Sequence, residues 1–419
     1  MKKIIKLFGV ITGILILIIS LLYITNHESL PEGIQGKEAD KLAHKMMNAL
    51  NKRAFDSTEI VEWSLRGKRH YKWKKQEGLV EISWDNIKVV LNLNDHSKSK
   101  GESPEIIKNA LNYFNNDSFW LVAPYKVFDE GTERRIVNYK DKDALLITYT
   151  SGGTTPGDSY LWILDSTYIP TSFKMWTRII PIGGVSATWN HLISAKSGIK
   201  LPTKHNISLF GMNIEINMGE VKAYNPNADK LARKILKAVK HEAYKKTRYI
   251  DWSFRDKRFY KWDKEQHIVE VRWNDARVIL QPNDLSKSIV YLKGKKITYN
   301  DNIVKRALDL FNNDSFWLVA PHKLFEYGIH RSIEIVDKKE NLHVTYSVGG
   351  TTPGDSYLWK VDKDYMPISY KMFVPSMKIN GVSVTWEDWI ETESGTLLPK
   401  KHRYTSGREL NMGNVKGYN

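Results

Sequence analysis

The candidate reactive residues of this chain lie in two sequence phrases, and each phrase occurs twice. The chain carries NNDSFWLVAP at residues 115–124 and again at 312–321, and GGTTPGDSYLW at 152–162 and again at 349–359. Each phrase holds one aspartate, so the retained carboxylates are Asp117, Asp158, Asp314 and Asp355. Paired carboxylates are the groups that acid/base enzymes such as glycoside hydrolases use. One hypothesis is therefore a hydrolase that acts on envelope polymers.

The same aspartates also have a structural interpretation. Pro156-Gly157 predicts a type II turn, because proline presets φ and the following glycine accepts a positive φ. Asp158 and Asp355 would then accept hydrogen bonds from loop amides. Asp117 and Asp314 precede Phe-Trp-Leu, where a turn or cap role is expected. The spacing of the aspartates does not bring two carboxylates together by itself.

Tryptophan is the second unusual feature, with 14 in the chain. Six pairs match between the two halves: Trp63/Trp252, Trp73/Trp262, Trp84/Trp273, Trp120/Trp317, Trp162/Trp359 and Trp189/Trp386. Each indole buries on the order of 150–250 Å², so the plain interpretation is a packed core. The sharper hypothesis is that these tryptophans line an apolar groove that binds a ligand.

Other kinds of site find little support in the sequence. Cysteine is absent, and of 12 histidines only His205 and His402 match between the halves, so we expect no metal site and no cofactor. The net charge is +16, but lysine and arginine are scattered, and no nucleic-acid-binding signature is present. We expect most retained cations to face solvent, or else to form a basic rim for an acidic headgroup: Arg66/Arg255, Arg69/Arg258, Lys72/Lys261, Arg134/Arg331 and Lys174/Lys371.

The first 25 residues have the character of a targeting segment. A positive flank with Lys2, Lys3 and Lys6 precedes an apolar stretch at residues 7–24. At about 1.5 Å per residue this stretch is close to the thickness of a bilayer core. It predicts a single-span anchor in the cytoplasmic membrane, with residues 26–419 extracytoplasmic, periplasmic or extracellular. A cleaved signal peptide is the alternative.

The elements that must position these residues are themselves duplicated. After a short linker at 26–36, the repeat predicts two domains, at 37–225 and 226–419, because the repeated unit has the size of a domain. Each copy begins with an amphipathic helix, continues with alternating strands and a second helix, and ends with more strands. Asp85-Asn86 and Asn274-Asp275 are candidate hairpin turns.

This order of elements predicts the fold class. We expect an α+β fold with two tandem copies of a strongly curved antiparallel β-sheet, a half-barrel, each with covering helices, and one N-terminal transmembrane helix. The covering helices would pack against the concave face of the sheet.

The element order and the aromatic-rich strands resemble the lipoprotein-carrier (LolA/LolB-like) superfamily. The two long phrases also resemble those of an uncharacterised group of bacterial envelope proteins. The resemblance to the carriers covers both copies and implies a cavity between the half-barrel and its helices that holds acyl chains. The tandem copy, the predicted anchor and the basic charge depart from that pattern.

The leading prediction is a membrane-anchored, non-catalytic binding protein for a hydrophobic or amphiphilic envelope ligand, such as acyl chains of a lipid or lipoprotein. The hydrolase is one alternative. An envelope scaffold or sensor that binds a protein partner is another.

Overall fold

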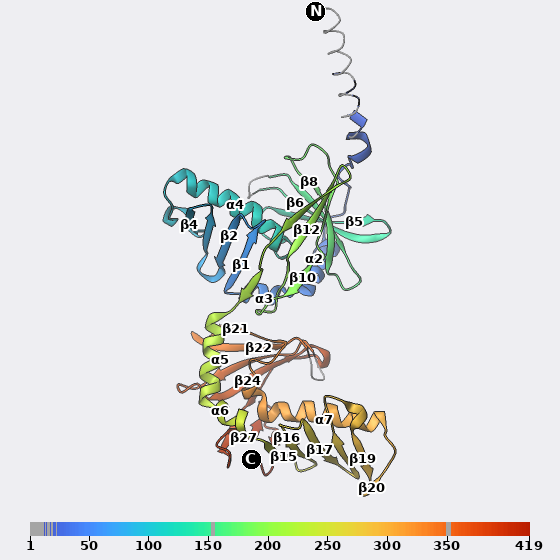
Figure 1. Cartoon of the computed structure of the whole chain (residues 1–419), viewed down its shortest axis with the longest axis vertical. Coiled ribbons are helices and arrows are strands. Elements are labelled where there is room, and N and C mark those ends of the chain that lie inside the picture. Colours follow the sequence, from blue (N-terminus) through green and yellow to red (C-terminus); the bar gives the residue numbers. More distant parts are fainter. Residues whose placement is uncertain are drawn as a thin grey trace, which may run out of the picture. The chain divides into compact units, whose positions relative to one another are not determined.

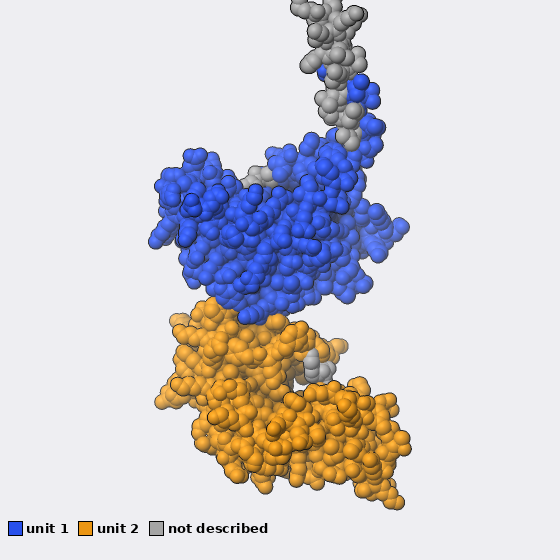
Figure 2. All heavy atoms as spheres, viewed as in Figure 1, with its two compact units in different colours: residues 1–224 blue, residues 225–419 orange. Residues whose placement is uncertain are grey.

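The computed structural model describes residues 23–151, 156–348 and 353–419, together with positions 12, 14, 17, 20 and 21. The chain divides into two compact units, residues 1–224 (unit 1) and residues 225–419 (unit 2), coloured separately in Figure 2. Each unit has its own hydrophobic cluster of buried side chains. The two units repeat one order of elements, with differences towards their C-terminal ends (Figure 1).

Unit 1 begins with two helices, followed by a four-strand meander and one long helix. These elements are α2 (Lys37–Ala49), α3 (Lys52–Ser57), β1 (Ile60–Leu65), β2 (Arg69–Lys74), β3 (Leu79–Trp84), β4 (Ile87–Asn92) and α4 (Pro104–Val122). The second half is made of strands: β5 (Thr132–Tyr139), β6 (Lys142–Tyr149), β7 (Ser159–Leu164), β8 (Pro170–Trp176), β9 (Val185–Thr188), β10 (Leu192–Ser194), β11 (Lys200–Pro202), β12 (Lys204–Leu209), β13 (Met212–Asn217) and β14 (Lys222–Tyr224).

These strands form three antiparallel sheets among the described residues. The orders are β14-β1-β2-β3-β4, β13-β12-β9-β8-β7-β6-β5, and the pair β10-β11. Helix α4 lies along β1–β4, and its C-terminal half reaches the second sheet (Figure 1). The core of unit 1 therefore lies between this helix and the two larger sheets.

Unit 2 repeats the plan. Its first half consists of α5 (Pro226–Ala238), α6 (His241–Lys246), β15 (Tyr249–Phe254), β16 (Arg258–Asp263), β17 (Ile268–Trp273), β18 (Ala276–Leu280), β19 (Ile289–Leu292), β20 (Lys295–Lys296) and α7 (Asp301–Val319). Its second half consists of β21 (Ile329–Val336), β22 (Lys339–Tyr346), β23 (Ser356–Val361), β24 (Pro367–Val374), β25 (Ile379–Thr385), β26 (Glu387–Glu391), β27 (Leu397–Arg403), β28 (Glu409–Asn411) and β29 (Lys416–Tyr418).

The sheets of unit 2 differ from those of unit 1 in both halves, and the first sheet also contains β19 and β20. Their orders are β20-β19-β18-β17-β16-β15-β29, β21-β22-β23-β24-β25 and β26-β27-β28. In unit 1, β12 pairs with β9 and so belongs to the second sheet. In unit 2 the corresponding contact is a single bridge between Val384 and Tyr404. The C-terminal hairpin of unit 2 is also shorter, with β28 in place of the longer β13.

Local sequence signals account for the helix starts and the tight turns. The Ser103 side chain accepts a hydrogen bond from the Ile106 amide, with Pro104 at the first helical position of α4, and the Asn300 side chain caps α7 in the same way. Both are established N-cap residues. Asp85 and Asn274 have φ of 49° and 47°, in the left-handed region that two-residue hairpin turns require.

The long helices run further than the sequence predicts. The NNDSFW phrase was expected at a helix exit, but it lies inside α4 and α7, which end at Val122 and Val319. Asparagine, aspartate and serine weaken a helix when their side chains compete for the backbone. Here the side chain of Asp117 is instead held by residues of β2, which removes that competition.

The predicted fold class is wrong in its central feature. One half-barrel sheet per copy was expected within an α+β fold, whereas the structure is mostly β-sheet, in several sheets that are all open among the described residues. Polar/apolar alternation predicts strands without naming their partners. In unit 1, β1 pairs with the last strand, with Ile60 opposite Tyr224. This pairing places β14 at the β1 edge of the meander. The meander and the second half of unit 1 therefore form separate sheets.

The structure also contradicts the predicted transmembrane helix and the single-pass localisation that depended on it. Among the described residues, no helix combines the length and the apolar character needed to cross a bilayer, which takes about 20 apolar residues. Helices α4 and α7 have 19 residues each but carry polar side chains throughout. Most of the predicted span at residues 7–24 lies outside the described residues.

Residues 28–34, within the predicted linker, are bound to unit 1. The backbone amides of Ile34 and Ile136 each donate to the other's carbonyl oxygen at 2.9 Å, so this segment adds to the edge strand β5. The Glu28 carboxylate pairs with Lys174, and the Trp176 indole donates to the Glu28 carbonyl oxygen at 2.7 Å. We call residues 28–34 the strap.

Candidate functional site

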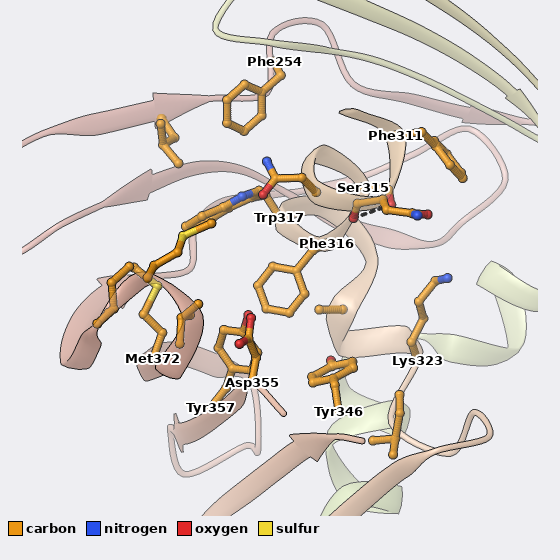
Figure 3. A pocket seen from close by; sticks show the side chains of 18 of the residues that line it. Phe254, Phe311, Ser315, Phe316, Trp317, Lys323, Tyr346, Asp355, Tyr357 and Met372 are labelled. Atoms are coloured by element: carbon orange, nitrogen blue, oxygen red, sulfur yellow. Dashed lines mark hydrogen bonds between the residues drawn. The ribbon is translucent and has the colours of Figure 1, made fainter. Parts of the chain in front are cut away.

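Unit 2 contains a cavity of about 560 Å³ beside the C-terminal half of α7 (Figure 3). Its wall combines residues of the helix, of the ends of β22–β25, and of the C-terminal hairpin. The lining residues are Phe254, Phe311, Asn312, Asn313, Ser315, Phe316, Trp317, Ala320, Lys323, Glu326, Tyr327, Ile329, Tyr346, Val348, Asp355, Tyr357, Met372, Val374, Met377, Ile379, Tyr404, Arg408 and Leu410. Most are aromatic or aliphatic.

Phe316 lies at the centre of the aromatic wall. Its ring centroid is 4.5 Å from that of Tyr357 and 5.9 Å from that of Tyr346, and Figure 3 shows it between Trp317 and the two tyrosines. These separations are those of ordinary tilted and edge-to-face aromatic pairs. The rings therefore form one continuous wall, and the free volume lies beside them.

Hydroxyl groups supply the polar features of this wall. The Tyr357 hydroxyl donates a long hydrogen bond of 3.5 Å to Oδ2 of Asp355. The Tyr346 hydroxyl is buried without a hydrogen-bond partner among the described residues. Burial raises the pKa of Tyr346 and of Tyr357 well above the usual tyrosine value. The Tyr346 hydroxyl can therefore donate to a bound molecule, whereas the proton of the Tyr357 hydroxyl is directed to Asp355.

Unit 1 keeps the same aromatic group at the equivalent positions. The Phe119 ring lies 4.3 Å from that of Tyr160, and the Tyr149 ring lies 5.7 Å from that of Tyr160. Met175 stands where unit 2 has Met372 and is likewise buried. The residues at the cavity mouth differ, because Tyr327 and Val348 of unit 2 correspond to Glu130 and Ser151.

Asp117 and Asp314 are structural residues in their two units. Asp314 is fully buried, and its oxygens accept from Nε and Nη2 of Arg258 at 2.6 and 2.9 Å. The Tyr260 hydroxyl donates to the same carboxylate at 2.5 Å, and the Asn313 amide donates at 2.8 Å. Asp117 has the matching set of donors: Arg69, Tyr71 and Asn116. These contacts fasten the long helix to the second strand of the meander.

Asp158 and Asp355 are also buried, at 3% and 5% exposure. Oδ1 of Asp158 accepts from the Arg178 amide at 3.0 Å, and the Tyr160 hydroxyl approaches Oδ2 at 3.4 Å. Gly157 and Gly354 have φ of 100° and 98°, the backbone that the predicted type II turn requires. Of the four candidate aspartates, Asp355 lines the cavity.

The candidate tryptophans are distributed between the cavity and the cores. Trp317 lines the cavity. Fully buried core positions, with relative exposure of 3% or less, hold Trp63, Trp162, Trp189, Trp252, Trp359 and Trp386. Partly buried positions against the same cores hold Trp73, Trp84, Trp120, Trp262 and Trp273. The Trp162 and Trp189 rings pack edge-to-face at 5.0 Å, so the structure brings these indoles into contact with each other.

Two of the retained cation pairs, and Lys174 of a third, do not face solvent freely. Arg69 and Arg258 bind the buried aspartates. Arg134 and Arg331 pair with carboxylates of the first helix of each unit, Asp40 and Asp229. Lys174 is 8% exposed and binds Glu28 of the strap. Arg69 and Arg258 lie on the same strand face as Tyr71 and Tyr260, and the long helix covers that face. Alternation along a strand does not show which helix or segment covers each face.

The retained histidines bind backbone carbonyls. Nδ1 of His205 lies 2.8 Å from the carbonyl oxygen of Thr188, and Nε2 lies 2.6 Å from that of Trp120. His402 makes the equivalent contact with Thr385 at 3.0 Å. Burial lowers the pKa of both, to about 4 for His402. His205 thus joins the sheet to the end of α4, and His402 binds the sheet carbonyl of Thr385.

Besides the aspartates and tryptophans, four residues of the cavity wall also match between the two copies. Phe119/Phe316, Tyr149/Tyr346, Tyr160/Tyr357 and Met175/Met372 match between the copies. Retained aromatic residues on strands are ordinarily core residues, so their retention does not by itself indicate a cavity. The cavity forms where strand ends and the helix converge, and periodicity does not report that convergence.

No known protein family and no curated protein matches this chain. Solved structures with some similarity include a domain from Vibrio parahaemolyticus named for outer membrane lipoprotein sorting. It has 9% identity and a TM-score of 0.24, over 44% of this chain and 93% of that one. A DUF1329 family protein from Desulfovibrio piger has 9% identity and a TM-score of 0.19, over 91% of this chain and 94% of that one.

Proposed function

We propose that unit 2 is a non-catalytic binding module for a hydrophobic or amphiphilic molecule, such as the acyl chain of a lipid or lipoprotein. The observation that carries this proposal is the cavity of about 560 Å³ with its aromatic and aliphatic wall. Ligand pockets typically measure roughly 300–1,000 Å³ and have mostly apolar walls with a few polar groups.

The expected source of affinity is the burial of apolar surface. Removing apolar area from water yields about 25 cal/mol per Å², before the costs of association. Phe316, Trp317 and Met372 supply flat and adaptable surfaces for a hydrocarbon chain. The protonated hydroxyl of Tyr346 offers a donor to an ester, carboxylate or hydroxyl of the ligand.

The hydrolase hypothesis has weaker support. Asp314 has its carboxylate occupied by Arg258, Tyr260 and Asn313, so it has no free oxygen for acid/base work. Asp355 lines the cavity without a second candidate aspartate beside it in the lining. A binding role requires only the apolar cavity wall and no catalytic pair of carboxylates.

A fluorescent fatty acid, dansyl-labelled undecanoic acid, tests the proposal with the full-length chain. The wild type is expected to bind it saturably, with a rise in dansyl emission. The variant Ile379→Trp replaces an aliphatic side chain by a bulky indole at a partly buried position of the wall. It should bind at least about tenfold more weakly, equivalent to about 1.4 kcal/mol.

Ile335→Trp is the matched control. Ile335 lies on β21, is 63% exposed and is not part of the cavity wall. This variant should bind the probe as the wild type does. Equal binding by wild type and Ile379→Trp would refute the cavity as the binding site.

A further inference from the structure

The cavity of unit 2 opens at one end of the sheet β21–β25. In an antiparallel sheet, the start of one strand lies beside the end of the next. Tyr327 precedes β21, Val348 follows β22, and Met377 follows β24, so all three belong to the same end of this sheet. All three also line the cavity. We call Tyr327, Val348 and Met377 the rim.

The rim residues are exposed although they are apolar or aromatic. Their relative exposures are 92% for Tyr327, 61% for Met377 and 45% for Val348. Isolated exposed apolar side chains are common, but a group of them around the mouth of an apolar cavity marks an interaction surface. Tyrosine in particular suits an interface with one apolar and one aqueous side.

Positive charges accompany this rim. Lys323 and Arg408 line the cavity together with the rim residues, and Lys378 directly follows Met377 in an exposed position. Two acids also line the cavity: the Glu326 carboxylate lies 3.5 Å from Nζ of Lys323, and Asp355 is buried. The whole chain has a net charge of +16. Apolar side chains flanked by cations match a lipid surface with anionic headgroups.

Unit 1 does not repeat this combination. Glu130 and Ser151 stand at the positions of Tyr327 and Val348, and Ile180, at the position of Met377, packs against the core of unit 1. The rim is therefore a specific property of unit 2, on a framework that both units share. This difference supplies matched control positions within one molecule.

We infer that the rim of unit 2 docks on the surface of an anionic lipid bilayer, with Tyr327, Val348 and Met377 entering the headgroup layer. This contact would bring the mouth of the cavity to the surface from which an acyl chain is drawn. The inference rests on the proposed binding function for its purpose, but the docking contact itself can be measured independently.

The absence of cysteine allows a clean measurement on the full-length chain. Met377→Cys, or in a second protein Tyr327→Cys, is labelled with an environment-sensitive NBD fluorophore. Vesicles of phosphatidylcholine with phosphatidylglycerol should shift the NBD emission to the blue and increase it. Vesicles of phosphatidylcholine alone, or added salt, should weaken the response because the attraction of exposed charges is screened. Glu130→Cys with the same label should respond much less.

A second set of variants replaces rim residues by those of unit 1. Tyr327→Glu and Val348→Ser, introduced into the Met377→Cys protein, change exposed side chains to residues that the equivalent positions already accept. The lipid-dependent shift at position 377 should be lost. Ile335→Trp in the same Met377→Cys protein, at a position outside the cavity wall, should leave the shift unchanged.

Three results would overturn the inference. The first is equal responses at positions 377 and 130, and the second is an equal response to neutral and anionic vesicles. The third is a shift that appears with rising protein concentration without lipid, which would assign the rim to a contact between copies of the chain. If the rim responds to lipid but Ile379→Trp still binds the fatty acid normally, the docking surface stands and the proposed cavity function fails.

Discussion

One position shows how the two units use the same backbone with different side chains. In unit 1, the Tyr125 hydroxyl oxygen lies 2.7 Å from the backbone carbonyl oxygens of both Leu50 and Lys200. In unit 2, Nε2 of His322 lies 2.9 Å from the carbonyl oxygen of Leu397, and its ring stacks on Tyr244 at 4.2 Å. Burial lowers the pKa of His322 from 6.5 to about 3. The ring is therefore neutral in the folded protein.

This histidine predicts acid sensitivity of unit 2. In the unfolded chain it binds a proton near pH 6.5, whereas the folded protein resists protonation until about pH 3. The stability is therefore complete above pH 6.5 and is lost progressively as the pH falls towards 3. His322→Tyr, which installs the unit 1 residue, should reduce the pH slope of the unfolding free energy by up to about 1.4 kcal/mol per pH unit.

Urea unfolding at a series of pH values, followed by tryptophan fluorescence, measures this slope. His96→Tyr, at an exposed position in unit 1, should leave the slope unchanged. An identical slope for the wild type and His322→Tyr would show that protonation of His322 is not linked to unfolding. Part of the slope should remain in the variant, because the pKa values of His241 and His402 are also lowered by burial.

At the scale of elements, the strap and the sheet face beneath it match in character. Val137, Ala144, Leu146 and Leu161 form a small buried cluster, and Gly33 of the strap lies against Val137. At the positions of Val137, Ala144 and Leu146, unit 2 has Glu334, Asn341 and His343. The face is thus apolar in the unit that carries the strap and polar in the other.

Gly33→Val should release the strap. A Cβ atom at this position would lie 2.8 Å from Cγ2 of Val137, 2.9 Å from Cβ of Arg135 and 3.0 Å from the carbonyl oxygen of Ile136. These contacts are too short for van der Waals packing. Digestion with a glutamate-specific protease should cut the variant faster than the wild type after Glu28 and Glu32.

Gln35→Val provides the comparison for the strap experiment. Gln35 is an exposed neighbour whose amide binds Glu133 at 3.0 Å, so its replacement removes one surface hydrogen bond and creates no close contact. Its digestion rate should stay near that of the wild type. Equal rates for Gly33→Val and the wild type would mean that the strap tolerates the extra methyl groups.

At the scale of the whole molecule, the two units have separate packed cores. Each core cluster is made of residues of one unit only. Each also contains its own buried Asp–Arg–Tyr group, around Asp117 in unit 1 and Asp314 in unit 2. A defect in one group should therefore be felt mainly in the unit that contains it.

Asp117→Asn and Asp314→Asn form a reciprocal pair. Each removes the charge that compensates a partly buried arginine, and the expected loss of stability is on the order of 3 kcal/mol. Hydrogen exchange followed by mass spectrometry should show weaker protection in β1, β2 and α4 for Asp117→Asn. The corresponding elements for Asp314→Asn are β15, β16 and α7.

The control for this pair is Asp309→Asn. Asp309 lies on the same helix as Asp314, but it is partly exposed and pairs with Lys305 on the surface. Surface pairs of this kind contribute roughly 0–1 kcal/mol, so protection should change little. Loss of protection in both units from either buried substitution would contradict separate cores.

The sequence by itself determined the features that depend on a few neighbouring residues. The hairpin turns predicted at Asp85-Asn86 and Asn274-Asp275 are confirmed, and the helix caps at Ser103 and Asn300 likewise depend on local residue types. Caps and tight turns are decided within four or five residues.

Strand pairing, the hydrogen-bond partners of the carboxylates and the position of the cavity depend on the tertiary structure. Ile60 pairs with Tyr224, and Asp117 binds Arg69 and Tyr71. The cavity wall joins residues from Phe254 to Leu410. Alternation fixes which face of a strand is apolar but leaves its partner open, because pairing between distant segments depends on how the whole unit packs. The predicted half-barrel is wrong because it depends on this long-range pairing, and the cavity depends on the same long-range packing.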